Sequence, residues 1–206
     1  MRQRRIQKRG NMLKSLIIYV FLIGFGTQCI AANPVLDIRY SVTEQSGNNV
    51  RLRIELRCSS PGKHILNSGD FYLNYNPQEI TYNTNPVRGK DYIWGDHFDP
   101  AIHPFFNLAK VIYEGFNPEK PELNLLDIAV IDSGFKSTGA LLDSGKWIPF
   151  VDILLHIKKP GNPSQLILEP VRSGNTLIGI FESFVAVPTN FDEGEGWDTP
   201  FVIKLE

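Results

Sequence analysis

Cysteine is scarce in this 206-residue sequence, which contains only Cys29 and Cys58. Cys29 lies in an N-terminal segment that we expect to be removed, so no intrachain disulfide can form in the mature chain. Its stability must then come from a packed core. Cys58 ends a series of alternating apolar residues, which predicts a buried structural thiol rather than a reactive nucleophile.

The sequence also lacks an apolar run long enough to cross a membrane, which takes about 20 residues. The run Leu16–Phe25 follows six Lys and Arg residues and no Asp or Glu, and it precedes the small residues Ala31 and Ala32. This order is typical of a secretory signal. We therefore predict a signal peptide over residues 1–31 and a secreted mature chain, residues 32–206, that is extracellular, at the cell surface or periplasmic.

Two questions about this segment stay open in the sequence. Translation starting at Met12 would still give a complete signal. Cys29 is a conceivable lipidation site, but the preceding residues Gly26-Thr27-Gln28 lack the usual aliphatic residue three positions before the cysteine. We therefore expect no lipid anchor.

The mature chain has little positive charge. Removal of residues 1–31 leaves 15 basic and 22 acidic residues, a formal net charge of −7. Binding to phosphate backbones needs concentrated positive charge, so we expect no nucleic-acid partner. A chain of about 175 residues fits one domain.

Familiar catalytic motifs are missing as well. The sequence has no Gly-x-Ser-x-Gly elbow, no His-Glu-x-x-His helix and no phosphate loop. A carboxylate pair such as Asp99 and Glu114 is conceivable, but nothing singles it out. We predict a protein that is not an enzyme and needs no cofactor.

Alternating apolar and polar residues, by contrast, are abundant. From Asn49 to Cys58 the apolar residues occupy every second position, which is typical of a half-buried strand in an antiparallel sheet. Similar patterns predict strands over 36–42, 123–131, 151–157, 165–169, 176–187 and 201–205. With turn signals between most of them, we expect an all-β fold, a single antiparallel β-sandwich or jelly roll of about nine strands.

One stretch, SGDFYLNYNPQEI at 68–80, is a strand that must end at Asn76-Pro77 because proline lacks a backbone donor. This stretch, Val87-Arg88-Gly89, and the turn Asp143–Lys146 before the amphipathic WIPFVDILLHIKK resemble the pattern of cohesin domains and related carbohydrate-binding modules. The resemblance implies a nine-stranded sandwich over about 35–188 and a binding function. Asn76 stands where cohesins prefer aspartate, and no dockerin-like calcium repeat is present, which argues against dockerin binding.

The segment DYIWGDHFDPAIH at 91–103 is the main candidate site. Aromatic faces and polar groups in a long loop suit a sugar or peptide, so we predict ligand binding by Tyr92, Trp94, His97 and Asp99. The alternative is that the aromatic residues close the end of the core. The spacing of His97, Asp99 and His103 fits no tight zinc signature, so we predict no metal site there.

Two further features bear on partners. The acidic loop 192–198 is either a calcium loop or a solvated turn. Arg51, Arg53 and Arg57 share one strand face, which would suit an acidic partner or is simply a solvated surface. We predict an exported binding module that recognises a polysaccharide or an exported protein, with adhesion through an exposed sheet face as the alternative.

Overall fold

The computed structural model describes residues 33–103, 106–113, 115, 120–132, 139–158, 166–171, 177–178, 192–197 and 199–203. The described residues belong to one compact unit, residues 33–206. The predicted signal peptide lies outside the described residues. In the described part of the chain, no helix is long and apolar enough to span a membrane.

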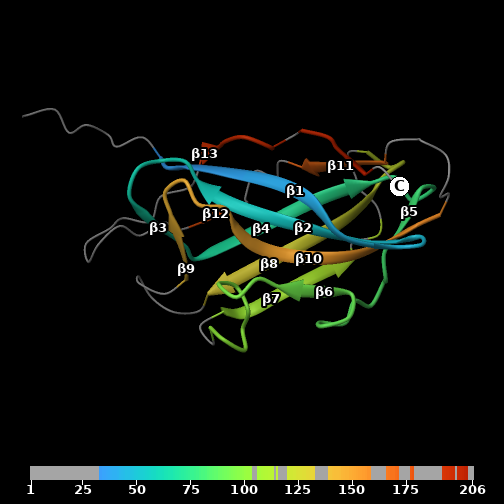
Figure 1. Ribbon diagram of the computed structural model, residues 1–206, viewed down its shortest axis with the longest axis horizontal. Coiled ribbons are helices and arrows are strands. Elements are labelled where there is room, and N and C mark those ends of the chain that lie inside the picture. The colour runs from blue at the N-terminus through green and yellow to red at the C-terminus, as the bar shows by residue number, and fades with distance from the viewer. Residues whose placement is uncertain are drawn as a thin grey trace, which may run out of the picture. The chain divides into compact units, whose positions relative to one another are not determined.

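The prediction of an all-β fold is confirmed, because the described residues form fourteen strands and no helix (Figure 1). This is more than the nine strands expected. The strands are β1 (Val35–Ser46), β2 (Asn49–Cys58), β3 (Lys63–Leu66), β4 (Ser68–Tyr75), β5 (Ile80–Thr81), β6 (Tyr92–Trp94), β7 (Phe106–Tyr113), β8 (Asn124–Asp132), β9 (Ala140–Asp143), β10 (Ile148–Ile157), β11 (Leu166–Val171), β12 (Leu177–Ile178), β13 (Asp192–Glu193) and β14 (Phe201–Ile203).

Two six-stranded sheets and one small sheet contain all of these strands. The first large sheet has the order β13-β1-β2-β10-β5, and β6 also pairs with β10. The second has the order β14-β11-β4-β8-β7, and β12 also pairs with β4. Strands β3 and β9 form the small sheet. Since β2 and β6 both pair with residues 151–153 of β10, they lie on its two opposite edges.

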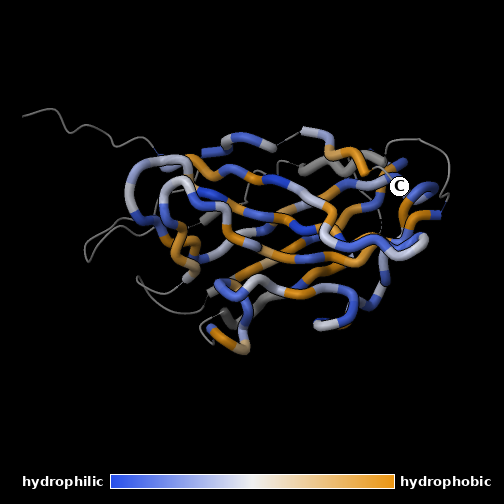
Figure 2. Tube along the Cα trace, viewed as in Figure 1, coloured by the Kyte–Doolittle hydropathy of each residue, from blue (hydrophilic) through white to orange (hydrophobic). Residues whose placement is uncertain are grey.

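The first sheet owes its two different faces to strict alternation along β2. Val50, Leu52, Ile54 and Leu56 are buried, whereas the three residues between them are half-buried. Figure 2 shows the same alternation of hydrophobic and hydrophilic positions along β1, β2 and β10. Cys58 also lies on the buried face, as predicted, and it forms no disulfide with another described residue.

The stretch 68–80 carries the chain from the second sheet to the first. Phe71, Leu73 and Tyr75 of β4 are buried, and the strand ends before Pro77. The carbonyl of Asn76 then accepts hydrogen bonds from the N–H groups of Glu79 and Ile80, at 3.1 and 2.9 Å. This turn places Ile80 in β5, which pairs with β10 of the first sheet.

The two large sheets share one hydrophobic core. The ring of Phe71 on β4 lies 4.7 Å from that of Phe150 on β10, and 5.8 Å from that of Trp197. Phe98, from the segment between β6 and β7, packs on Phe150 at 4.8 Å. Aromatic side chains from four parts of the chain therefore join the sheets.

The acidic loop considered for calcium is bound to β1 in the described residues 192–197. The N–H of Glu195 donates to the Asp37 carboxylate at 2.8 Å, and Trp197 Nε1 donates to the carbonyl of Leu36 at 2.6 Å. Asp37 also pairs with Arg57 at 2.7 Å. In the described part of the chain, no three His, Cys, Asp or Glu side chains are grouped to hold a metal ion.

Candidate functional site

Tyr92 and Trp94, the predicted aromatic ligand-binding residues, lie mostly in the core. Tyr92 is 8% exposed and Trp94 3% exposed. Their rings meet edge to face, with an interplanar angle of 79° and centroids 5.9 Å apart, and Trp94 also packs on Phe150. They form no flat exposed platform, so the geometry favours the alternative in which these rings complete the core.

The other two predicted residues, His97 and Asp99, belong to a turn after β6. The Asp99 carboxylate accepts a hydrogen bond from the N–H of Ala101 at 2.8 Å and forms an ion pair with Arg88. The carbonyl of Asp99 accepts from the N–H groups of Ile102 and His103. His97 is exposed, and its ring stacks on His103 with centroids 6.5 Å apart. Asp99 therefore organises this turn.

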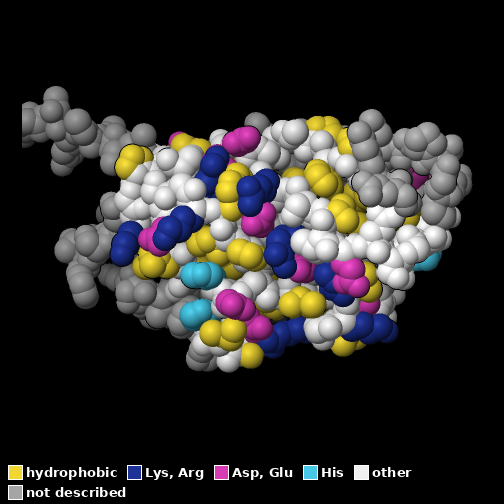
Figure 3. Space-filling model, in the orientation of Figure 1, with side chains coloured by type: hydrophobic (Ala, Val, Ile, Leu, Met, Phe, Trp, Pro, Cys, Tyr) yellow, Lys and Arg dark blue, Asp and Glu magenta, His cyan; other side chains and the backbone are white. Residues whose placement is uncertain are grey.

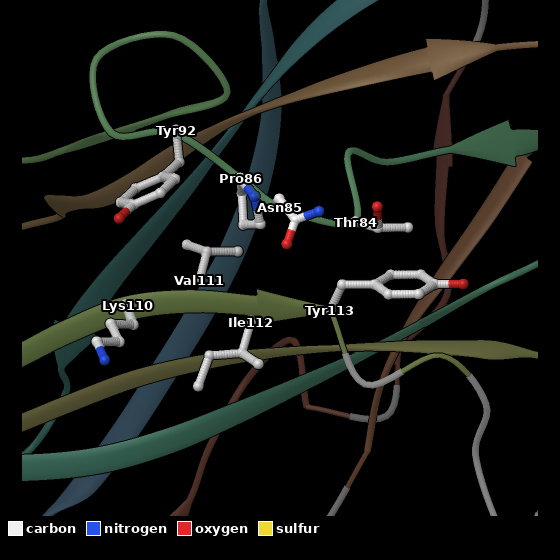
Figure 4. Close-up of a pocket in the computed structure, with 8 residues that line it drawn as sticks. All are labelled: Thr84, Asn85, Pro86, Tyr92, Lys110, Val111, Ile112 and Tyr113. Atoms are coloured by element: carbon white, nitrogen blue, oxygen red, sulfur yellow. The ribbon is translucent and has the colours of Figure 1, made fainter.

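A groove lies next to this segment, where β6 at the edge of the first sheet and β7 at the edge of the second are drawn on the same side of the unit (Figure 1). Its volume is about 400 Å³, within the range of ligand sites. We call it the edge groove (Figure 4). It is lined by Thr84, Asn85, Pro86, Tyr92, Lys110, Val111, Ile112 and Tyr113.

The lining shows that the groove follows the edge of β7. Four consecutive residues of this strand, 110–113, border the same space. Successive side chains of a strand point to opposite faces of its sheet, so a space beside one face would meet only alternate residues. A space that meets all four lies beside the backbone edge. Figure 4 shows Val111 directed toward Pro86 and Asn85 on the other wall.

The wall opposite β7 is held by the buried carboxylate of Asp91. This carboxylate accepts hydrogen bonds from Asn83 Nδ2 at 3.0 Å and from the N–H of Val87 at 2.8 Å. The carbonyl of Asp91 accepts from the N–H of Leu154 on β10, also at 2.8 Å. The irregular segment 83–91 is thus attached to the first sheet at a fixed position, so the groove is preformed.

Gly89 completes the turn in this wall. It has a φ of 81°, a conformation that side chains rarely adopt, and its N–H donates to the carbonyl of Tyr92. Gly89 belongs to Val87-Arg88-Gly89, which was noted in the sequence only for its resemblance to cohesin domains and related carbohydrate-binding modules.

Four tyrosines, at 75, 82, 92 and 113, lie close to one another, and two of them, Tyr92 and Tyr113, line the edge groove. Burial raises the pKa of Tyr75 to about 12. A hydrogen bond with Asn124 lowers this pKa and the nearby Tyr113 raises it, both to a smaller extent. Burial also raises the pKa of Tyr82, reinforced by the charge of Asp91. Burial raises the pKa of Tyr92, and the nearby charge of Arg88 lowers it to a smaller extent. The hydroxyls of Tyr75, Tyr82 and Tyr92 are therefore uncharged at neutral pH.

A second pocket, of about 340 Å³, is lined by residues 81–83 and 91 of the chain that connects β5 to β6 and by residues 154–156 of β10, with which both strands pair. His156 on its rim lies 3.0 Å from Asn49, measured from Nδ1 to Oδ1. The lining residues are Asn49, Thr81, Tyr82, Asn83, Asp91, Leu154, Leu155 and His156.

Positive charge borders the edge groove. Lys110 forms part of its wall and is exposed, and no ion pair joins it to another described residue. Arg88 lies close enough to Tyr92 to influence its pKa, but its guanidinium is already paired with Asp99. Lys110 thus gives the groove a positive charge in a chain whose mature part has a formal excess of acidic residues.

Exposed apolar side chains are also concentrated in this region. Among the described residues, five large hydrophobic side chains are exposed, and three of them lie between residues 87 and 102, in or after the segment that forms one wall of the groove. These are Val87 at 55%, Ile93 at 41% and Ile102 at 53%. They add exposed apolar surface to this part of the chain.

The arginine face of the first sheet is different, because its charges are already paired. Arg53 donates to both carboxylate oxygens of Asp152, at 2.8 and 2.9 Å. Arg51 pairs with Glu44, and Arg57 with Asp37 and Glu195. Figure 3 accordingly shows basic side chains beside acidic ones on the face that it presents. The structure therefore gives less support to an acidic partner on this face than the sequence did.

The chain matches no protein-family model and no curated protein. The resemblance to cohesin domains and carbohydrate-binding modules therefore stays a prediction.

Sequence reasoning found one wall of the groove and missed the other. Tyr92 was a predicted site residue and lines the groove, but β7 was not predicted. The signal for β7 was the run of β-branched and aromatic residues VIY at 111–113. Its position at the sheet edge depends on pairing with β8, which no local pattern specifies.

Proposed function

We propose that this protein is an exported, non-enzymatic binding module that recognises a polypeptide in the edge groove. Its two large sheets would be the layers of a single β-sandwich, with the groove along one open side. The observation that carries the proposal is the lining of the groove by four successive residues of an edge strand. Such a site offers backbone groups, apolar contacts and positive charge to one ligand.

A polypeptide has more support than a glycan. Sugar recognition commonly uses an exposed aromatic face, and Tyr92 and Trp94 are buried with their rings edge to face. The exposed side chains of Val87, Ile93 and Ile102 instead suit the apolar part of a protein interface.

The adhesive alternative, pairing through an exposed sheet face, has weaker support. The arginines on the face of β1, β2 and β10 already form ion pairs with carboxylates of this chain, so a partner would have to displace those ion pairs. A catalytic role for Asp99 also lacks support, because its carboxylate is bound to Arg88 and the N–H of Ala101. Glu114 lies outside the described residues.

Selection of peptides on the purified protein tests this function. A displayed library of random peptides about ten residues long, longer than a typical strand, would be selected for binding. Synthetic copies would then be titrated by fluorescence anisotropy against two variants. Asn85→Trp places a large ring in the groove, and Ser46→Trp places the same ring on the exposed β1–β2 hairpin.

We expect Asn85→Trp to weaken peptide binding by about tenfold or more, and Ser46→Trp to leave it unchanged. Circular dichroism would verify that both variants are folded. Equal binding by the two variants would exclude the edge groove as the site. Saturable binding of soluble polysaccharides but not of peptides, lost in Asn85→Trp, would replace the polypeptide with a glycan.

A further inference from the structure

The edge of β7 that faces the groove offers hydrogen-bonding groups to an incoming strand. β7 pairs with β8 along one edge, and among the described residues no strand pairs with its other edge. In an antiparallel pair, the N–H and C=O groups of every second residue point away from the partner. Such unpaired groups are a template for the addition of another strand.

The opposite wall of the groove does not use these groups. In the described part of the chain, no backbone hydrogen bond joins residues 84–86 to β7. Pro86 has no N–H to donate, and the Asp91 hydrogen bonds hold this segment on β10. The space between the walls is therefore open to a ligand.

Edge strands are often protected from pairing by bulges and charged residues. In β7 the register shift lies at Phe106/Leu108, whereas Leu108 to Tyr113 pair with β8 without interruption. These six residues match the typical strand length of about 5–6 residues. The part of β7 that lines the groove, 110–113, falls within this regular stretch.

The charge of the groove argues for a particular partner. Lys110 borders it without an ion pair to a described residue, and Lys90 is exposed in the turn that follows Pro86, where Arg88 is already paired with Asp99. A second copy of this chain, added symmetrically through β7, would present the same patch on both subunits. Like charges opposite each other on paired strands are unfavourable, whereas carboxylates on alternate residues of a strand would be attracted.

We propose that the edge groove binds an extended, carboxylate-bearing segment of another polypeptide, which adds to β7 as a further strand. This inference rests on the proposed function and specifies its ligand. Backbone hydrogen bonds to β7 would supply affinity, and Lys110 would select for acidic residues.

The peptides selected on the purified protein provide the test. We expect them to be enriched in Asp and Glu at alternate positions, and to slow amide hydrogen exchange in residues 108–113. N-methylation of the peptide backbone at one set of alternate residues should abolish binding, while methylation of the other set should be tolerated. Lys110→Glu should weaken binding by about tenfold, and Lys63→Glu, an exposed lysine on β3, should not.

Each other outcome counts against a defined part of the inference. Binding that is lost in Asn85→Trp but tolerates both methylation sets would exclude strand addition and leave the proposed function standing. Peptides without acidic enrichment, or unaffected by Lys110→Glu, would exclude the acidic ligand. A sedimenting dimer with slow exchange in 108–113 would assign the edge to a second copy. If no peptide binds the protein, or if Asn85→Trp leaves peptide binding unchanged, the proposed function itself is overturned.

Discussion

The backbone N–H of Glu195 donates a 2.8 Å hydrogen bond to the carboxylate of Asp37, a residue 158 positions earlier in the chain. Asp37 is buried, and the same carboxylate pairs with Arg57 on β2. The bond belongs to a set that fixes 192–197 on β1, together with Trp197 Nε1 bound to the carbonyl of Leu36. An acidic loop near the C-terminus is thus a structural part of the first sheet.

Asp37→Asn should destabilise the protein by about 2–3 kcal/mol, because hydrogen bonds to a charged group are lost and Arg57 keeps only a solvent-exposed partner. Urea unfolding followed by circular dichroism would measure the change. The matched control is Glu44→Gln, which removes the exposed partner of Arg51 and should cost less than about 1 kcal/mol. Equal losses in the two variants would show that Asp37 does not hold the loop.

Gly196 is a second fixed point of this loop. Its φ is 87°, and an added Cβ would overlap the carbonyl oxygen of Ile38. Gly145 has a φ of 78° but open space around it, so Gly145→Ala should cost only the backbone strain, about 1–2 kcal/mol. Gly196→Ala should cost at least about 1 kcal/mol more, because the methyl group must displace β1. Thermal and urea unfolding of both variants would reveal whether this difference exists.

The parts of the fold that the sequence predicted are those encoded by neighbouring residues. The alternation in 49–58 predicted β2 and its buried face, since a period of two determines which residues point inward. The break at Asn76-Pro77 predicted where β4 ends. Short strands such as β5, β6 and β13 were missed, because two or three residues contain no period to detect.

The candidate site was only partly predictable, because its geometry depends on contacts between distant residues. Composition made Tyr92 and Trp94 candidates, but with β6 paired to β10 both rings are buried, and Trp94 packs on Phe150. The groove arises where residues 84–86 come to lie beside 110–113. No sequence pattern specifies this approach.

Trp147, just before β10, should stabilise the outer face of the first sheet through its ring. The guanidinium groups of Arg39 and Arg57 lie over this ring, at 4.4 and 4.3 Å from its centroid. Trp147→Ala should cost about 1–2 kcal/mol, since each cation–π contact at a partly exposed site contributes about 0.5–1 kcal/mol. Trp147→Phe keeps an aromatic face and should lose less. Urea unfolding would separate the variants, and equal losses would contradict a contribution from the aromatic face, because Trp147→Phe retains one.

The buried tyrosines should make the protein sensitive to alkaline pH. Burial raises the pKa of Tyr75 to about 12 and also raises that of Tyr82, whereas an unfolded tyrosine titrates near about 10. Above pH 10 the unfolded chain therefore loses protons that the folded protein keeps, so ionisation favours unfolding. The stabilisation that comes from keeping Tyr75 and Tyr82 protonated is fully present below about pH 10, where unfolded tyrosines are also protonated. It is lost as the pH rises toward the pKa values of these tyrosines in the folded protein.

Urea unfolding between about pH 8 and pH 11.5 would measure this decline. In Tyr82→Phe the decline should be shallower, because one of the groups with a raised pKa is gone. The variant should be no less stable than the wild type at pH 8, since the Tyr82 hydroxyl has no hydrogen-bond partner within the described structure. An alkaline slope that Tyr82→Phe leaves unchanged would show that Tyr82 does not keep its proton above the pH at which an unfolded tyrosine loses it, because the folded and unfolded pKa values would then be the same.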